Sequence, residues 1–138
     1  MVTLMMALGL AAASPAAAAK NAYPKAAAAY VVERDGKTLW SGNADKRLPP
    51  ASLVKMMTAL LVIEGGRLDE TVTVSRAASR ETGTRLGLRE GDRLTARDLL
   101  TATIVRSAND ACRALADARG GSEVGFVATM NARAGRLG

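Results

Sequence analysis

The chain has 138 residues and a formal net charge of +6, a length that fits one domain with a modest hydrophobic core. It contains no histidine, which excludes Ser-His-Asp and Cys-His catalysis and argues against a transition-metal site. The only cysteine, Cys112, cannot form an intrachain disulfide and is interpreted as a small buried hydrophobe rather than a reactive thiol. Acidic residues are interspersed among the basic ones without long runs of like charge, so a solvated surface is favoured over nucleic-acid binding.

The N-terminal segment is apolar and uncharged. Residues 1–19 have no charged side chain, and Ala17-Ala18-Ala19 provides a small-residue cleavage pattern before Lys20. We therefore expect a secretory signal peptide over 1–19, a linker over 20–27 and a mature protein in the periplasm or cell envelope. The basic n-region of such peptides is absent, which leaves the true start codon open. The apolar run is too short to favour a membrane span.

The first half of the mature chain predicts a hairpin followed by a helix. Residues 28–33 and 37–41 form β-like runs around Asp35-Gly36, a strong signal for a two-residue turn. After Pro49-Pro50, a helix is expected from about residue 51 to Ile63, ended by Gly65-Gly66. Apolar residues surround this helix almost completely, which predicts a buried central helix. Lys55 is its only charge before the C-terminal turn. Burial of an amine costs several kcal/mol unless it is paired or uncharged, so we interpret Lys55 as functional.

The second half predicts short elements and then three helices. A strand is expected over 71–74, a helical turn over 75–80 and a short extended piece over 85–88. The capping box Thr95 to Asp98 begins a helix that runs through Ile104. A further helix is expected from Asp110 to Gly120-Gly121, and Ser122 caps a last one that ends near Arg136.

Two short motifs carry candidate chemistry. Ser52 and Lys55 are spaced i, i+3 on the predicted helix, so the amine reaches the hydroxyl. A serine needs a base to become a nucleophile, and an apolar environment favours the uncharged amine that can accept its proton. Ser107 and Asn109 lie between two predicted helices, where Ser107 can relay a proton and Asn109 can bind the amine and a substrate amide. The alternative is that both residues only cap the helix that Asp110 opens.

The order of these motifs resembles the low-molecular-mass penicillin-binding proteins that act as serine-type D-alanyl-D-alanine carboxypeptidases. The resemblance covers residues 28–138. Residues 51–60 are similar to the family's nucleophile helix, residues 87–100 to the segment before its second motif, residues 107–111 to that motif, and residues 130–138 to the following helix.

This resemblance implies a fold and a reaction. The fold is α/β (α+β) of the β-lactamase/transpeptidase-like type, with a helical cluster against an antiparallel sheet. Ser52 is implied as the acylated nucleophile, Lys55 as general base, Ser107 as proton relay and Asn109 as substrate-positioning residue. The implied enzyme removes the terminal D-alanine from the peptidoglycan pentapeptide through an acyl-enzyme, and β-lactams such as penicillin acylate the same serine. No cofactor or metal is implied.

One element of the family's pattern is not found. The family has a Lys-Thr-Gly strand far downstream of the second motif, and Lys55 is the last lysine here. We therefore expect residues 28–138 to be a truncated catalytic domain without its C-terminal sheet strands, poorly folded and of low activity in isolation. Membrane association is expected only through a missing C-terminal segment.

Two alternative functions remain open at this point. A class A-like β-lactamase shares Ser-x-x-Lys, but its usual second motif is Ser-Asp-Asn, whereas this chain has Ser-Ala-Asn. A non-catalytic exported cell-wall-binding protein would instead use the basic surface.

Overall fold

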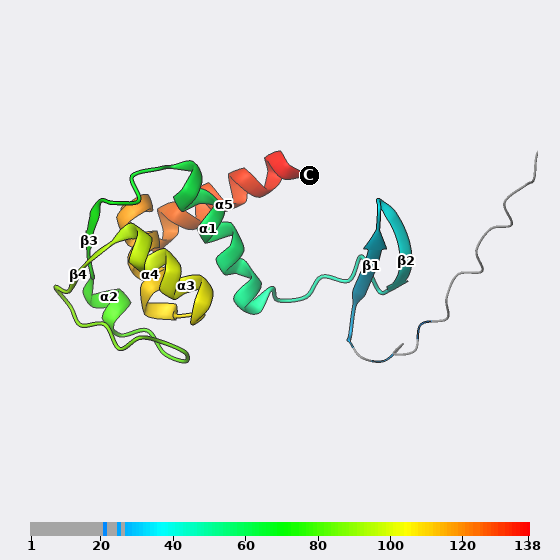
Figure 1. Ribbon diagram of the computed structural model, residues 1–138, viewed down its shortest axis with the longest axis horizontal. Helices are drawn as coiled ribbons and strands as arrows, with labels where there is room; N and C mark the ends of the chain where they lie inside the picture. The colour runs from blue at the N-terminus through cyan, green and yellow to red at the C-terminus, as the bar shows by residue number, and fades with distance from the viewer. Residues whose placement is uncertain (1–20, 22–24, 26) are drawn as a thin grey trace, which may run out of the picture. The chain divides into compact units, whose positions relative to one another are not determined.

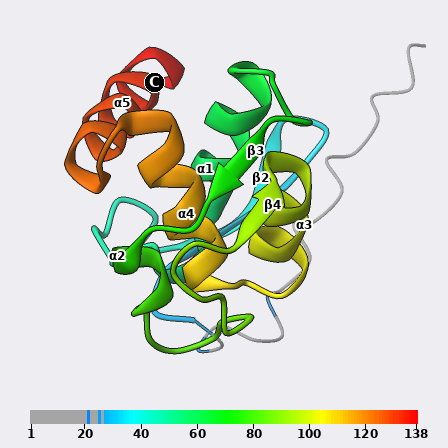
Figure 2. The ribbon, with the colours of Figure 1, turned by 90° about the vertical axis from the view of Figure 1, so that its left-hand side faces the viewer.

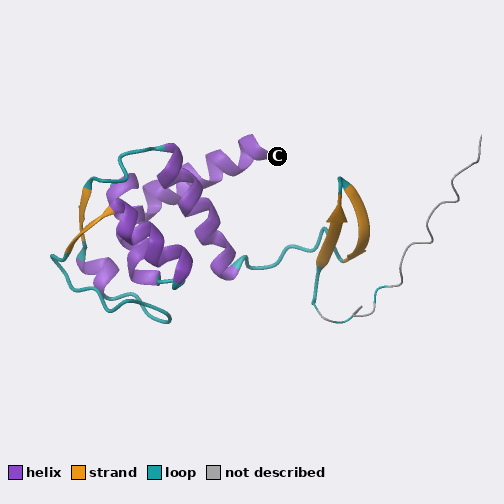
Figure 3. Cartoon of the chain, viewed as in Figure 1, coloured by secondary structure: helices purple, strands orange, loops and turns teal. Residues whose placement is uncertain are grey.

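The computed structural model describes Asn21, Lys25 and residues 27–138. The predicted signal peptide, residues 1–19, lies outside the described residues, as does most of the predicted linker. The chain divides into two units, one that ends at Leu48 and one of residues 49–138. Among the described residues, the first unit contains two strands, and helices form most of the second unit (Figure 3).

The first unit contains an antiparallel hairpin of β1 (Tyr30–Arg34) and β2 (Lys37–Gly42) (Figure 1). Asp35 and Gly36 form the turn with φ angles of 52° and 71°. Both values lie in the left-handed region, as the favoured two-residue hairpin turn requires. The predicted hairpin is confirmed, with its first strand beginning two residues later than expected.

The second unit begins with the helical segment that carries Ser52. A 3₁₀ turn, η1 (Ala51–Leu53), continues into α1 (Val54–Glu64). The prediction that this helix is buried on all sides is wrong for the structure. Lys55, Thr58 and Val62 form one buried stripe at i, i+3 and i+7. Within α1, Val54, Met56 and Ile63 are exposed, because the other helices of this unit pack along only part of its circumference.

A small antiparallel ribbon precedes the remaining helices. β3 (Thr71–Thr73) pairs with β4 (Arg93–Thr95) in register Thr71 to Thr95. The sequence pattern missed β4 and instead predicted an extended piece over 85–88, which is loop. Between the two strands lies the short helix α2 (Arg76–Ser79), whose N-cap Ser75 accepts a hydrogen bond from the Ala78 N–H at 3.0 Å.

Three helices complete the unit: α3 (Ala96–Val105), α4 (Asn109–Gly120) and α5 (Glu123–Leu137). The predicted N-caps of α3 and α5 are confirmed, because the side chains of Thr95 and Ser122 each accept a backbone N–H at 3.1 Å. α4 lies against α2, α3 and α5, and Figure 2 shows it next to α5. No helix within the described residues is long and apolar enough to cross a membrane. The core centres on small and aliphatic side chains, among them Val62, Val72, Val74, Leu99, Ala111 and Leu115.

Glycines shape the corner between α4 and α5. Gly121 ends α4 with a φ of 69°, as the Gly-Gly signal predicted. Gly120 packs so closely on the start of α5 that a Cβ there would lie 2.7 Å from the Cα of Phe126. Real Cβ atoms do not approach a backbone atom this closely, so the corner requires glycine at position 120.

Candidate active site

Ser52 lies on the exposed surface at the start of the helical segment. It is the middle residue of the 3₁₀ turn, and Lys55 follows it in the first turn of α1. Pro50 immediately precedes this turn and fixes the chain direction at its start. The sequence therefore places an accessible hydroxyl at the N-terminus of a helical segment, the end that carries the positive partial charge of the helix dipole.

The Lys55 amine is surrounded by oxygen atoms. Its side chain is buried, with an exposed fraction of 7% for the residue. Nζ donates to the Ser107 carbonyl oxygen at 2.8 Å, to Ser107 Oγ at 3.0 Å and to Asn109 Oδ1 at 2.7 Å. An ammonium group has three N–H donors, so these bonds satisfy all of them. The expected apolar environment of the amine is therefore wrong: Lys55 is buried, but its head group lies in a polar cage.

Ser107 links this amine to the candidate nucleophile. Its hydroxyl accepts from Lys55 and donates to Ser52 Oγ at 3.1 Å. Ser107 has a φ of 54°, a left-handed conformation that costs a non-glycine residue about 1–2 kcal/mol. In this conformation both the carbonyl and the hydroxyl of one residue lie within 3.0 Å of the same amine. The structure thus connects Lys55, Ser107 and Ser52 by a continuous path of hydrogen bonds.

Asn109 is held by a loop that sequence reasoning did not connect with it. Its Nδ2 donates to the Thr82 carbonyl oxygen at 2.6 Å, and its backbone N–H donates to the Thr84 carbonyl oxygen at 2.8 Å. Because Nδ2 faces a carbonyl, Oδ1 is left to face the Lys55 amine. The alternative that Ser107 and Asn109 are only helix caps is not supported, since no side-chain cap hydrogen bond forms at the N-terminus of α4.

Asp110 is a charged residue of the site region whose contacts the sequence did not reveal. Its exposed fraction is 1%, and its carboxylate accepts backbone N–H groups from Leu86, Gly87 and Leu88 at 2.8–3.1 Å. Burial alone would raise the pKa of Asp110, but the backbone donors, with that of Ala111 added, outweigh it and lower the pKa. The carboxylate therefore stays ionised in the interior.

A cavity of about 440 Å³ adjoins these residues. Cys112 lines it, with the sulfur 3.5 Å from Thr58 Oγ1, and burial raises the pKa of the thiol. The cysteine is half-buried, so it is less enclosed than the sequence interpretation supposed. Within the described part of the chain, no group of three or more His, Cys, Asp or Glu side chains is placed to hold a metal ion. The wall is formed by residues of both motifs and of α4 and α5, including Ser52, Lys55, Asn109, Arg113, Phe126 and Met130.

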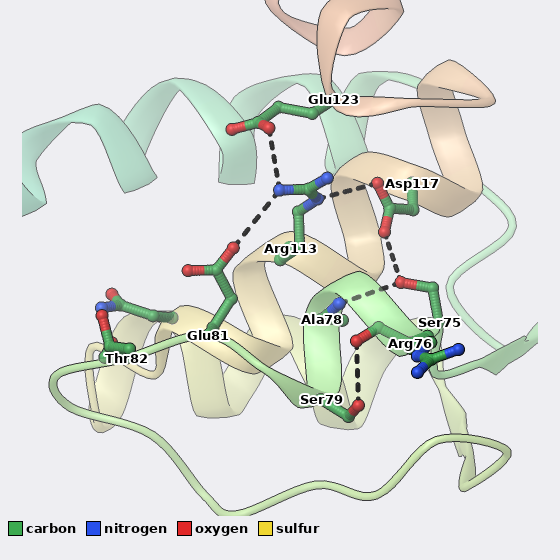
Figure 4. Close-up of polar contacts among 10 residues, drawn as sticks. Ser75, Arg76, Ala78, Ser79, Glu81, Thr82, Arg113, Asp117 and Glu123 are labelled. Carbon is green, nitrogen blue, oxygen red and sulfur yellow. Dashed lines mark hydrogen bonds and ion pairs between the residues drawn. The ribbon is translucent and has the colours of Figure 1, made fainter.

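Arg113 joins three elements beside this cavity (Figure 4). Its guanidinium contacts Asp117 at 2.9 Å, Glu123 at 2.8 Å and Glu81 at 3.3 Å. The hydrogen bond to Asp117, helped by the charges of all three carboxylates, raises the pKa of Arg113 above its usual value. The contact with Glu81 anchors the start of the loop that holds Asn109.

Comparisons with known proteins identify a family that this chain resembles. The family model for D-alanyl-D-alanine carboxypeptidase matches residues 14–138. The chain is 37% identical over 120 residues to the D-alanyl-D-alanine carboxypeptidase DacF of Bacillus subtilis, covering 83% of this chain and 31% of DacF. It is 39% identical over 114 residues to DacC of Escherichia coli, covering 75% of this chain and 28% of DacC. The chain thus spans less than a third of the length of these two relatives.

Solved structures give the same result for the fold. The D-alanyl-D-alanine carboxypeptidase DacD from Francisella tularensis matches with a TM-score of 0.70 and 35% identity, over 76% of this chain and 27% of DacD. Penicillin binding protein 6B from Escherichia coli matches with a TM-score of 0.66 and 41% identity, over 74% of this chain and 36% of that protein. The predicted mixed α/β fold of the penicillin-binding-protein type is confirmed.

Proposed function

We propose that this chain, which belongs to the D-alanyl-D-alanine carboxypeptidase family, carries the nucleophile of a serine-type enzyme. The proposed enzyme removes the terminal D-alanine from the peptidoglycan pentapeptide. The observation that carries the proposal is the hydrogen-bonded path from Lys55 through Ser107 to Ser52. Asn109 Oδ1 accepts a hydrogen bond from the same amine. Lys55 is the amine that lies within hydrogen-bond reach of this path and can serve as its base.

In the acylation step, Ser52 Oγ attacks the carbonyl carbon between the last two D-alanines. The form of Lys55 that acts as base is the neutral amine, whose two N–H groups donate to the Ser107 carbonyl oxygen and to Asn109 Oδ1 while its lone pair faces Ser107 Oγ. Ser107 gives its own proton to this amine and accepts that of Ser52, which requires its hydroxyl to rotate from the orientation in which it donates to Ser52. The peptide C–N bond breaks as the serine ester forms, and the proton returns along the same path to the departing D-alanine amine. Water then hydrolyses the ester and regenerates Ser52.

The remaining parts of the proposal concern location and ligands. Residues 1–19 act as the signal peptide, residues 28–138 belong to the catalytic domain, and the protein works in the periplasm or cell envelope. Its partners are the peptidoglycan stem peptide as substrate and β-lactams as covalent inhibitors. Ser52 is exposed, which fits attack on a large polymeric substrate.

The test uses the full-length gene product incubated with a fluorescent penicillin. We expect a covalent adduct on Ser52 that Ser52→Ala abolishes, that Lys55→Met reduces by at least about 100-fold in rate, and that Ser79→Ala leaves unchanged. Release of D-alanine from a pentapeptide should follow the same order.

Three results would contradict the proposal. Labelling that persists in Ser52→Ala would place the nucleophile elsewhere. Rapid turnover of a chromogenic cephalosporin without release of D-alanine would indicate the class A-like β-lactamase. Saturable peptidoglycan binding with no adduct would indicate the non-catalytic cell-wall-binding protein.

A further inference from the structure

Asp110 binds three consecutive backbone N–H groups of a distant loop. Leu86 N donates to Oδ1 at 3.1 Å, while Gly87 N and Leu88 N donate to Oδ2 at 2.8 and 3.0 Å. Gly87 has a φ of 86°, which bends the chain so that successive N–H groups converge on one anion, as in backbone nests. A buried carboxylate on the first turn of α4 therefore fixes residues 86–88.

The same loop holds Asn109 a few residues earlier. The carbonyls of Thr82 and Thr84 accept its side-chain and backbone N–H groups, with Gly83 between them at a φ of 76°. Gly83 lies so near that a Cβ on it would be 3.1 Å from Asn109 Nδ2. If the amide turned over, its NH₂ group would face the donating Lys55 amine, and its oxygen would face the Thr82 carbonyl. The loop thus determines that Oδ1 of Asn109, and not Nδ2, faces the Lys55 amine.

We propose that Asp110 is a positioning residue for the reaction. By fixing residues 86–88 to α4, it holds the carbonyls of Thr82 and Thr84 against Asn109 and keeps Oδ1 directed at Lys55. This inference rests on the proposed function and adds a role for the residue after the second motif. Asp110 acts through the loop and Asn109, without contact with the reacting atoms.

The consequence is an energetic coupling between Asp110 and Asn109. In Asp110→Asn, an NH₂ group replaces one carboxylate oxygen and confronts N–H donors of the loop, so the loop moves. Displacements of about 1 Å near a reacting centre lower rates by up to about 100-fold. Without the Asn109 side chain there is no amide that the loop could turn away from Lys55. The same loop movement should then change the acylation rate only slightly.

A double-mutant cycle on the acylation rate by fluorescent penicillin, in the full-length gene product, tests this coupling. We expect Asp110→Asn to slow acylation by about 10- to 100-fold when Asn109 is present. In an Asn109→Ala background, the same change should slow it by no more than about 2- to 3-fold, a factor close to the scatter of mutant-cycle measurements. Equal factors in both backgrounds would overturn the proposal, because a general loss of structure acts regardless of Asn109.

A matched control lies in the same loop. Asp92 accepts the N–H of Arg89 at 2.8 Å through Oδ2, whereas the hydrogen bonds of Asn109 go to Lys55, Thr82 and Thr84. Asp92→Asn should therefore leave acylation unchanged in both backgrounds. A loss with Asp92→Asn that also depends on Asn109 would show that any loosening of the loop has this effect, and Asp110 would have no special role.

A second variant reaches the same contact from the loop side in case Asp110→Asn fails to fold. Gly83→Ala places a methyl group against Asn109 Nδ2 and also strains the backbone at a φ of 76°. Its effect on acylation should therefore shrink in Asn109→Ala without vanishing. An undiminished effect would contradict the proposal.

An NMR readout separates this inference from the proposed function, because it needs no activity. With asparagine labelled selectively, the Asn109 side-chain NH₂ should be protected from hydrogen exchange in the wild type and in Asp92→Asn, and lose protection in Asp110→Asn. Suppose that Asp110→Asn loses this protection but penicillin labels no form of the protein. The link between Asp110 and the orientation of Asn109 would then stand, and the proposed function would be refuted. Retained protection in Asp110→Asn would refute the linkage.

Discussion

Ser107 allows the chemical role of a hydroxyl to be separated from the conformational role of its backbone. Its Oγ lies 3.0 Å from Lys55 Nζ and 3.1 Å from Ser52 Oγ, while its φ is 54°. Both Ser107→Ala and Ser107→Gly remove the hydroxyl, and only glycine adopts this φ without strain.

The two variants should react alike but differ in stability. Loss of the proton path should slow acylation of Ser52 by about 100- to 10,000-fold in each. Relief of about 1–2 kcal/mol of backbone strain, offset by the greater freedom of unfolded glycine, should leave Ser107→Gly about 0.5–1 kcal/mol more stable than Ser107→Ala. Stopped-flow acylation by penicillin and urea unfolding measure the two quantities.

Acylation rate and stability can each contradict these expectations separately. If Ser107→Gly is acylated at the wild-type rate, the hydroxyl is not on the proton path. If Ser107→Ala is the more stable variant, the positive φ does not strain the chain. Ser79→Ala, which removes an exposed hydroxyl bonded to the Arg76 carbonyl, serves as the control and should change neither quantity.

Three further predictions concern stability and reactivity. Leu99→Ala, at a fully buried position, should lower the free energy of unfolding by about 3 kcal/mol in urea titrations. Ile104→Ala, at a half-exposed position on the same helix, should lower it by less than about 1 kcal/mol. Equal losses of unfolding free energy in the two variants would contradict the assigned core. Because burial raises the pKa of the Cys112 thiol, iodoacetamide at pH 8 should alkylate the folded protein at least about 10-fold more slowly than the urea-unfolded protein, and similar rates would show the thiol to be accessible. The pKa of the Asp110 carboxyl is lowered on folding, so its stabilising effect is complete above about pH 4 and is lost as the pH falls through the pKa of the folded state. The difference in free energy of unfolding between wild type and Asp110→Asn should therefore narrow in acid. A difference that stays constant from pH 7 to pH 2 would contradict this.

Local signals predicted the elements whose causes are local. The Asp35-Gly36 turn, the caps at Thr95 and Ser122 and the glycines that end helices all depend on neighbouring residues, and the structure contains each of them. Motif spacing likewise predicted that Ser52, Lys55, Ser107 and Asn109 come together, and hydrogen bonds link all four. These bonds connect Lys55 to Ser52 through Ser107, whereas the i, i+3 spacing predicted that the amine reaches the Ser52 hydroxyl itself. The catalytic roles of the four residues stay predictions.

Features that depend on contacts between distant segments were not predictable. β4 exists because three residues pair with β3, about twenty positions earlier in the chain. The Thr82 carbonyl that orients Asn109 lies 27 residues away, and no periodicity marks it. Composition also overstated the burial of α1, because an apolar sequence shows what a helix is able to bury and not what packs against it. The polar cage of Lys55 escaped notice for the same reason, since its oxygens come from residues more than fifty positions downstream.

The close approach of Gly120 to Phe126 has a consequence for how this protein tolerates variation. In a saturation library, position 120 should accept glycine alone, because even one added methyl group would push the first turn of α5 away from α4. Val124, in that same turn, is 80% exposed and should accept many side chains. Diversity for engineering should therefore be introduced on the outer surface of α5 and not at its junction with α4.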